Sequence, residues 1–173
     1  TFWEELREYS AEDETRQILK TQCRLYERTL GTSVTLRNGL ISLLDQTFPE
    51  INNVLHSDYR NIRGHFKWVD FVRRFWHRDC VISLSTRSFE ESYRKWCKKE
   101  GYCFRYTDTE KIYRCAKNAV ATFPKNESTK VLIAQAVDSL NAVYDALQIL
   151  RGEMTRLASL LPEYEVVMGM QGA

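Results

Sequence analysis

The stretch ESTKVLIAQAVDSLNAVYDALQILRGEMTRLASLL, residues 127–161, does most to determine the fold. Its apolar residues recur at alternating steps of four and three, which places them on one side of an α-helix. This stripe consists of Ile133, Val137, Leu140, Tyr144, Leu147, Met154 and Leu161, with Arg151 as a polar member. Asn126 can cap the first turn, and Pro162 ends the pattern. We therefore predict a helix over 127–161, about 52 Å long at 1.5 Å per residue.

A second pattern with the same spacing lies near the start of the chain and ends at Pro49. Its members are Leu19, Cys23, Tyr26, Leu30, Val34, Ile41, Leu44 and Phe48, with Arg37 where another apolar residue would fall. Ser10 with Asp13 and Glu14 is typical of a helix start. Gly31 and Gly39 each cost about 1 kcal/mol relative to Ala, which allows a break near Gly31 to Thr35. A stripe this long must pair with another long helix, either within the chain or in a second copy.

The region between the two stripes predicts shorter helices. One helix is expected over 67–81, another from a Ser88/Glu91 capping box to Gly101, and a third over 108–119. No alternating strand pattern is longer than four or five residues. The predicted fold class is all-α, with two long coiled-coil-like helices flanking a compact insert. The predicted segments are 1–48 (first long helix), 49–125 (insert), 126–161 (second long helix) and 162–173 (start of a further domain).

Composition describes a folded chain without a membrane span. Hydrophobic residues make up 43% of the 173 residues, and no apolar run reaches 18 residues. Five cysteines form no framework pattern, and their odd number favours a reducing compartment. We therefore predict a cytoplasmic protein with no membrane partner. The chain opens on Thr1 without a signal sequence, and we expect it to be an internal part of a longer protein.

The middle of the chain is basic and rich in aromatic residues. Between Tyr59 and Arg105 there are 12 Lys/Arg against 5 Asp/Glu, an excess of seven positive charges in a chain of net charge +2. Cations neutralise phosphates and aromatic rings can stack on unpaired bases, so this region is a candidate nucleic-acid interface. The candidate residues are Arg60, Arg63, Lys67, Arg73, Arg74, Arg78, Arg87, Arg94 and Lys95. The alternative is a solvated basic face over an aromatic core.

Catalytic signatures are absent from the sequence. It contains no glycine-rich phosphate loop, no His-Glu-x-x-His and no Gly-x-Ser-x-Gly. His77 and Cys80, with Cys97 and Cys103, could be imagined as zinc ligands, but tight ligand pairs are missing. Asp138 and Asp145 share a helix face and could hold a metal, although solvated acids at this spacing are ordinary. We predict no catalytic residue, no metal site and no cofactor on this chain.

Several stretches, taken in order, resemble the transposases of bacterial insertion-sequence family 110. They are Trp3–Tyr9, Asp13–Arg16, Leu43–Pro49, Lys67–Phe71 with Phe75–His77, and Leu157–Tyr164 leading to Met170–Ala173. The resemblance implies a RuvC-like domain with four metal-binding acids before this region, and a domain with a nucleophilic serine after it. No residue of this chain matches a catalytic position of that family.

The resemblance implies the helical middle region of a DNA transposase. Its partners would be DNA and a structured guide RNA, and the divalent metal, Mg²⁺, would belong to the separate catalytic domain. The length of the stripes predicts a homodimer or higher oligomer. Two other functions stay open: a structural oligomerisation module without nucleic-acid contact, and a metal-dependent nuclease that uses Asp138 and Asp145.

Overall fold

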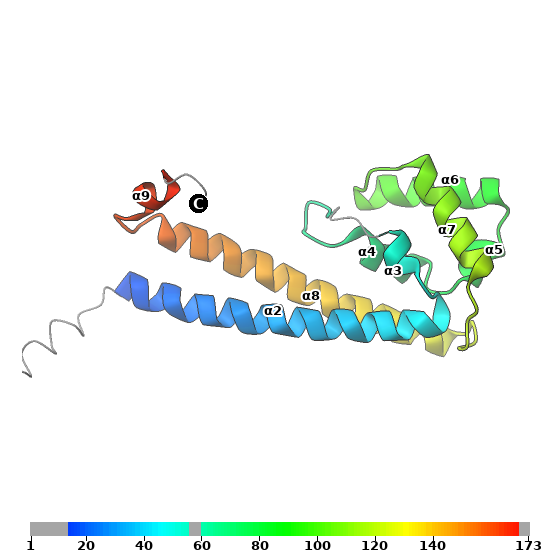
Figure 1. Cartoon of the computed structure of the whole chain (residues 1–173), viewed down its shortest axis with the longest axis horizontal. Coiled ribbons are helices and arrows are strands. Elements are labelled where there is room, and N and C mark those ends of the chain that lie inside the picture. Colours follow the sequence, from blue (N-terminus) through cyan, green and yellow to red (C-terminus); the bar gives the residue numbers. More distant parts are fainter. Residues whose placement is uncertain (1–13, 56–59, 170–173) are drawn as a thin grey trace, which may run out of the picture. The chain divides into compact units, whose positions relative to one another are not determined.

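The computed structural model describes residues 14–55 and 60–169, and the regular elements in that part of the chain are helices. Of the residues that the structure describes, 75% are helical, which confirms the all-α class and the two long helices (Figure 1). The helices are α2 (Glu14–Thr47), α3 (Ile51–Val54), α4 (Lys67–Arg74), α5 (Asp79–Ile82), α6 (Thr86–Glu100), α7 (Tyr106–Asn118), α8 (Glu127–Ala158) and α9 (Tyr164–Met168). None of them, within the described ranges, is long and apolar enough to cross a membrane.

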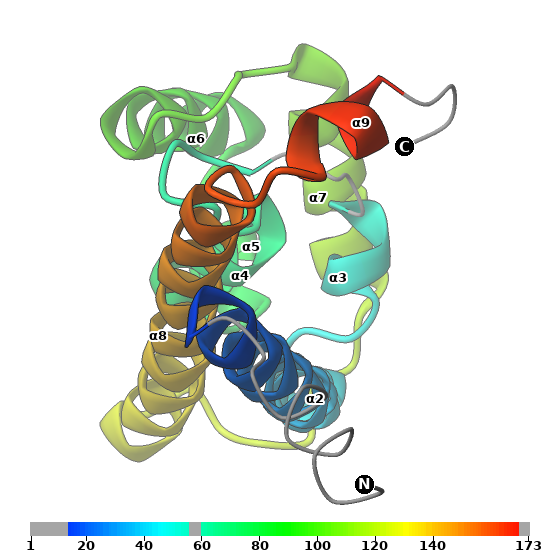
Figure 2. The same cartoon turned by 90° about the vertical axis from the view of Figure 1, so that its left-hand side faces the viewer.

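The chain divides into two compact units, each described here by itself. Unit 1 takes Thr1–Gly31 and Ala146–Ala173, and unit 2 takes Thr32–Asp145. Unit 2 therefore holds the second half of α2, the insert helices and the first half of α8. Within unit 2, α7 packs against α3, α5 and α6 (Figures 1 and 2). The predicted helix start at Ser10 lies outside the described residues.

Helix α2 is continuous, so the break that the glycines allowed near Gly31 to Thr35 does not occur. Its buried residues are Ser33, Leu40, Leu44 and Thr47, followed by Phe48. Two members of the predicted stripe, Leu30 and Val34, are instead 44% and 52% exposed. Arg37 lies on the buried side, with its guanidinium 5.9 Å from the ring centre of Trp68. A cation–π contact accounts for the polar residue in an otherwise apolar row.

Helix α8 follows its predicted stripe as far as Leu147, whereas Leu157 is buried further on in place of Met154. Ile133, Val137, Leu140, Tyr144 and Leu147 are all buried. The Thr129 N–H donates to Asn126 Oδ1 at 2.9 Å, which confirms the predicted cap. The helix ends at Ala158 rather than at Leu161, because the last hydrogen bonds tighten to a three-residue spacing ahead of Pro162.

The predicted single helix over 67–81 is wrong, because it is divided into α4 and α5 by the side chain of His77. His77 Nε2 donates to Phe123 O at 3.1 Å, and His77 Nδ1 accepts from the Asp79 N–H at 3.1 Å. This imidazole replaces the backbone bonds of a helical turn. The cap of α6 is Ser85, whose hydroxyl accepts from the Ser88 N–H, so Ser88 lies inside the helix. Gly101 ends α6 with a φ of 76°, as predicted.

An aromatic cluster forms the core of unit 2. Phe71 contacts the rings of Phe75, Tyr93 and Trp96 at centroid distances of 4.8–5.8 Å. Tyr93, Trp96 and Tyr102 stack in succession, with interplanar angles of 16° and 18°. All these rings are at most 8% exposed. The idea that they stack on unpaired bases is therefore wrong, and the alternative of an aromatic core is correct.

Candidate nucleic-acid interface

A largely buried carboxylate, that of Asp70, connects several segments on the polar side of unit 2. It lies in the first turn of α4, where the helix dipole favours a negative charge. Tyr102 Oη donates to Asp70 Oδ2 at 2.6 Å, and Asn141 Nδ2 donates to Asp70 Oδ1 at 2.7 Å. Asn61 Nδ2 donates a longer hydrogen bond, of 3.4 Å, to Asp70 Oδ2. Asp70 thus connects α4 to the turn at residue 61, to the end of α6 and to α8.

His65 lies beside this hub and connects it to a second carboxylate. His65 Nε2 is 2.8 Å from Asp145 Oδ1, and His65 Nδ1 is 3.8 Å from Asp70 Oδ2. Burial raises the pKa of Tyr102 well above its usual value, and its hydrogen bond to Asp70 raises it further. Tyr102 therefore stays protonated and acts as a donor to Asp70.

The hub lies at the edge of a pocket of about 1000 Å³, named here the polar pocket. Five cations line it: Arg63, Arg73, Arg74, Lys95 and Lys99. Four carboxylates line it as well: Asp70, Glu100, Asp138 and Asp145. The cations come from the turn before α4, the end of α4 and the second half of α6, whereas α8 supplies two of the acids. Folding therefore brings together charges that are far apart in the sequence.

The structure brings four of the nine predicted nucleic-acid-binding residues together at one site. Arg63, Arg73, Arg74 and Lys95 all line the polar pocket and are exposed. Arg73 is 3.0 Å from Asp138, and both side chains are about half exposed. Such a pair contributes little to stability and can be exchanged for a phosphate contact. These four residues remain candidates for nucleic-acid contact.

Lys67 must be removed from the candidates, because it is buried. Only 3% of the residue is exposed. Its ammonium donates to Asp108 Oδ2 and to Cys103 O, both at 2.9 Å. It also lies 5.3 Å from the ring centre of Tyr93. The side chain holds α4 to the α6–α7 connection and cannot reach a phosphate in solution.

The other four candidates lie outside the polar pocket. Arg78 is mostly buried and donates to Ala119 O, so its role is structural. Arg60 covers the ring of Phe66, with 4.0 Å between guanidinium and ring centre. Arg87 and Arg94 are exposed on α6 and pair with Glu91 and Glu90 at 3.6 and 2.8 Å. Exposed pairs of this kind leave both arginines accessible.

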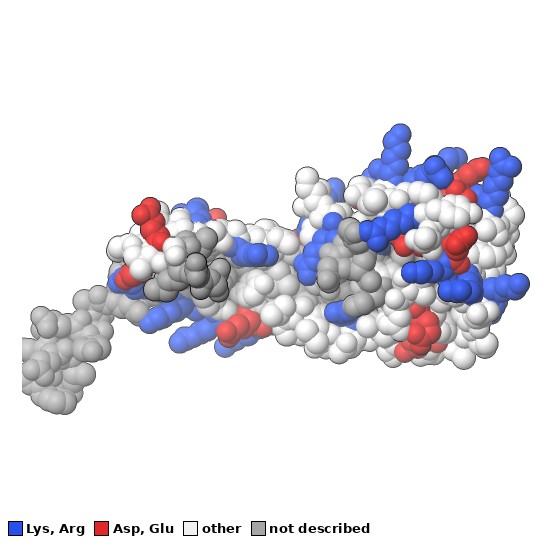
Figure 3. Space-filling view, turned by 45° about the horizontal axis from the view of Figure 1, so that its top comes forward, with Lys and Arg blue, Asp and Glu red and all other residues white. Residues whose placement is uncertain are grey.

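Basic side chains gather over the insert of unit 2 (Figure 3). The exposed cations of α6 and α7 are Arg87, Arg94, Lys95, Lys98, Lys99, Lys111, Arg114 and Lys117. The sequence prediction stopped at Lys95 and omitted Lys99, which lines the polar pocket. It also missed the polar residue Asn141, although Asp138, Asn141 and Asp145 show helical spacing.

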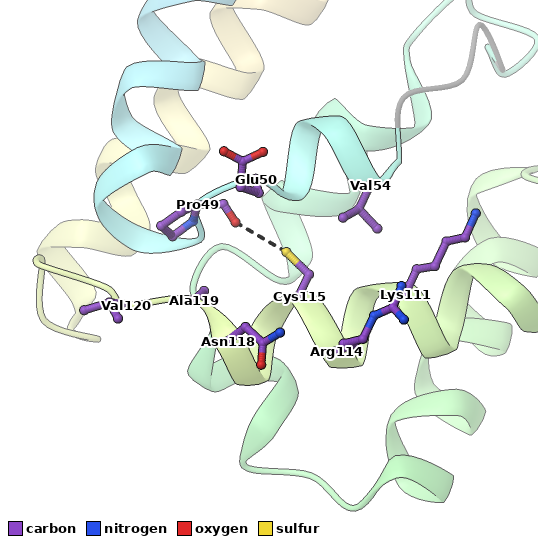
Figure 4. A pocket seen from close by; sticks show the side chains of 9 residues that line it. All are labelled: Pro49, Glu50, Val54, Lys111, Arg114, Cys115, Asn118, Ala119 and Val120. Carbon is purple, nitrogen blue, oxygen red and sulfur yellow. Dashed lines mark hydrogen bonds between the residues drawn. The ribbon is translucent and has the colours of Figure 1, made fainter.

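A second pocket, of about 600 Å³, lies between α3, α7 and the start of the α7–α8 connection (Figure 4). Pro49, Val54, Ala119 and Val120 contribute apolar surface to it. The Cys115 thiol donates to Pro49 O at 3.4 Å. Burial raises the pKa of Cys115, and the charge of Glu50 raises it further. The thiol is therefore protonated and unsuited to act as a nucleophile.

The metal sites imagined from the sequence do not assemble. Across residues 14–55 and 60–169, no three His, Cys, Asp or Glu side chains are close enough to hold a metal ion. His77 is instead bonded to Phe123 O, and Cys97 is buried with a raised pKa caused mainly by burial. Asp138 and Asp145 pair separately with Arg73 and His65.

The chain matches no protein-family model, and no curated protein or solved structure is significantly similar to it.

Proposed function

We propose that this chain is the helical middle region of a DNA transposase, and that the polar pocket contacts nucleic-acid backbone. The ordered stretches that resemble insertion-sequence family 110 support the first part. The all-α architecture with two long helices agrees with that expectation. The parent protein would act in the cytoplasm, with its divalent metal in a separate catalytic domain.

The observation that carries the nucleic-acid contact is the convergence of five cations on one pocket. Arg63, Arg73, Arg74, Lys95 and Lys99 come from three separate segments of unit 2. Lys99 has 82% of its side chain exposed and Arg73 has 55%, so their charged groups are accessible. Lys and Arg in this arrangement can neutralise successive phosphates and release their counterions. The nearby carboxylates limit the number of phosphates that bind.

A salt series tests this proposal. Labelled duplex DNA and a labelled structured RNA are titrated with the full chain between low and moderate salt. With about four phosphate contacts, the logarithm of the binding constant should fall against the logarithm of the salt concentration with a slope of about −3 to −4. An affinity that does not change with salt, or no binding at low salt, would contradict the proposal.

A structural module is the second candidate, and it has its own supporting observation. Four carboxylates line the same pocket as the five cations, and Arg73 is paired with Asp138. In that case the charged side chains would stabilise the insert through ion pairs and would bind no nucleic acid. The double change Arg73→Glu/Arg74→Glu in the parent protein separates the two functions. Transposition at the normal level would favour the structural module.

We also propose that unit 1 mediates self-association as a homodimer or a higher oligomer. Ile18, Leu25 and Leu30 of α2 are 43–50% exposed, and Ile149 of α8 is 69% exposed. Burial of such residues against a second copy would remove apolar surface from water. Light scattering at increasing concentration should show a mass above that of the monomer, and a monomer mass throughout would contradict self-association.

A further inference from the structure

The polar pocket offers a face of hydrogen-bond acceptors in addition to its cations. Asp138, Asn141 and Asp145 lie on one side of α8 and line the pocket. We name these three residues the acceptor face. Each carboxylate uses one oxygen for its partner: Asp138 Oδ2 for Arg73, and Asp145 Oδ1 for His65. The second oxygen of each can accept a further donor, because a carboxylate has about four acceptor positions.

Asn141 provides a second, independent observation that a hydrogen-bond donor to the acceptor face is missing. The residue is only 9% exposed, and its Nδ2 is committed to Asp70 at 2.7 Å. Its Oδ1 is buried and has no hydrogen-bond partner. The amide cannot be turned around, since Oδ1 would then face the Asp70 carboxylate. Buried side-chain oxygens are normally paired, so this unpaired oxygen, on a residue that lines the pocket, points to a missing donor.

An exposed apolar residue lies at the same pocket. Ile62, in the turn between Arg60 and Phe66, lines the pocket with its side chain fully exposed. Apolar side chains of this kind can pack against the face of a base. The pocket thus combines cations, acceptors and apolar surface.

We propose that the polar pocket holds one unpaired nucleotide whose base carries an exocyclic amino group, as adenine, cytosine and guanine do. This inference rests on the proposed function. The phosphates would lie against Lys95, Lys99 and Arg63, and the amino group would donate to the acceptor face. Thymine and uracil are disfavoured, because the carbonyls beside their single N–H would face the carboxylates. An unpaired base offers both N–H donors of its amino group, whereas Watson–Crick pairing uses one of them, so a single strand is the better ligand.

The test compares two single strands that differ only in their bases. The full chain is titrated with labelled oligo(dC) and oligo(dT) of about 12 nucleotides, within the range that single-strand grooves cover. Oligo(dC) should bind about tenfold more tightly, the change expected for one hydrogen bond to a charged group. Oligo(dT) should still bind through its phosphates. An oligo(rC) strand shows whether RNA or DNA is preferred.

Variants of the acceptor face localise the effect. Asp138→Asn/Asp145→Asn should remove most of the preference for oligo(dC) while the binding of oligo(dT) stays equal or rises. Both side chains are about half exposed, so the fold should tolerate the change. Asp45→Asn on the exposed side of α2 is the matched control and should leave the preference intact. Circular dichroism checks that each variant is folded.

The outcomes separate the two proposals. Equal, salt-dependent binding of oligo(dC) and oligo(dT) would overturn the nucleotide pocket and leave the backbone contact in place. A preference for oligo(dC) that survives the double substitution would also overturn the pocket assignment. No binding of any strand or duplex at low salt would overturn both the pocket and the proposed function.

Discussion

The two units differ in how far they enclose large apolar side chains in a core. In unit 2, Phe71, Phe89 and Tyr93 are completely buried in a cluster of contacting rings. In unit 1, Leu147 and Leu157 are buried, whereas Ile18, Leu25 and Ile149 are 43–69% exposed. An insert rich in large rings can enclose a core within one unit. A single apolar stripe on a long helix cannot enclose a core in this way. Much of the apolar surface of unit 1 therefore stays accessible to solvent.

The largest difference between the units should appear when a core side chain is removed. Phe71→Ala should lower the free energy of unfolding by about 3–5 kcal/mol, because it leaves a cavity among packed rings. Leu25→Ala, on the exposed side of α2, should change it by about 0.5 kcal/mol or less. Denaturant unfolding measures both values. Similar losses in the two variants would show that the contrast between the units is wrong.

The next effect concerns the buried ion pair of unit 2. Lys67→Met keeps most of the side-chain volume but leaves Asp108 without its cation. The free energy of unfolding should fall by about 3 kcal/mol, because the remaining carboxylate is largely buried. The change should leave oligonucleotide affinity the same in the folded variant, since Lys67 is not at the surface. A stable variant with weakened binding would return Lys67 to the interface.

A smaller effect is expected at the Asp70 hub, and it depends on pH. Burial raises the pKa of Tyr102, so this residue keeps its proton in the folded chain at pH values where the unfolded chain loses it. The stabilisation is complete below pH 10 and declines as the pH rises above it. Tyr102→Phe should cost about 1–2 kcal/mol at neutral pH and flatten the alkaline decline. An unchanged decline would argue against burial as its cause.

The smallest effect should come from the ion pair of unit 1. Arg16 contacts Glu163, with 38% and 59% of the two side chains exposed. Glu163→Gln should change the free energy of unfolding by about 0.5 kcal/mol or less, since water and salt screen exposed pairs. Thermal unfolding at two salt concentrations measures this. A loss as large as that of Lys67→Met would show that unit 1 is more tightly packed than its exposed apolar residues indicate.

The sequence predicted the long helices well because each has one periodic apolar stripe. The buried apolar positions from Ile133 to Leu147 in α8 were expected, and so was the cap at Asn126, whereas the buried Asn141 was not. The stripe predicted for α2 was partly wrong, because Leu30 and Val34 are exposed. Ser33 and Leu40 are buried in their place, and they follow the same spacing together with Leu44, so the spacing alone could not select them.

The insert and its site were harder to predict, because they depend on contacts between distant residues. Nothing local shows that His77 replaces a helical turn through a bond to Phe123 O. The fate of the basic residues also depends on tertiary structure: Lys67 is buried, while Lys95 is exposed at a pocket. A count of charges cannot separate them, nor can it place the acids of α8 beside the cations of α4 and α6.

The most direct test of the account compares two charge reversals of equal size in one binding experiment. The full chain with Arg74→Glu/Lys95→Glu changes two exposed cations of the polar pocket, and the chain with Arg24→Glu/Arg151→Glu changes two exposed cations of unit 1. Both are titrated with the same labelled oligonucleotide at low salt. The account predicts that the first variant loses at least about tenfold in affinity and the second loses little. Equal losses in both variants, or no loss in the first, would contradict a nucleic-acid interface at the polar pocket.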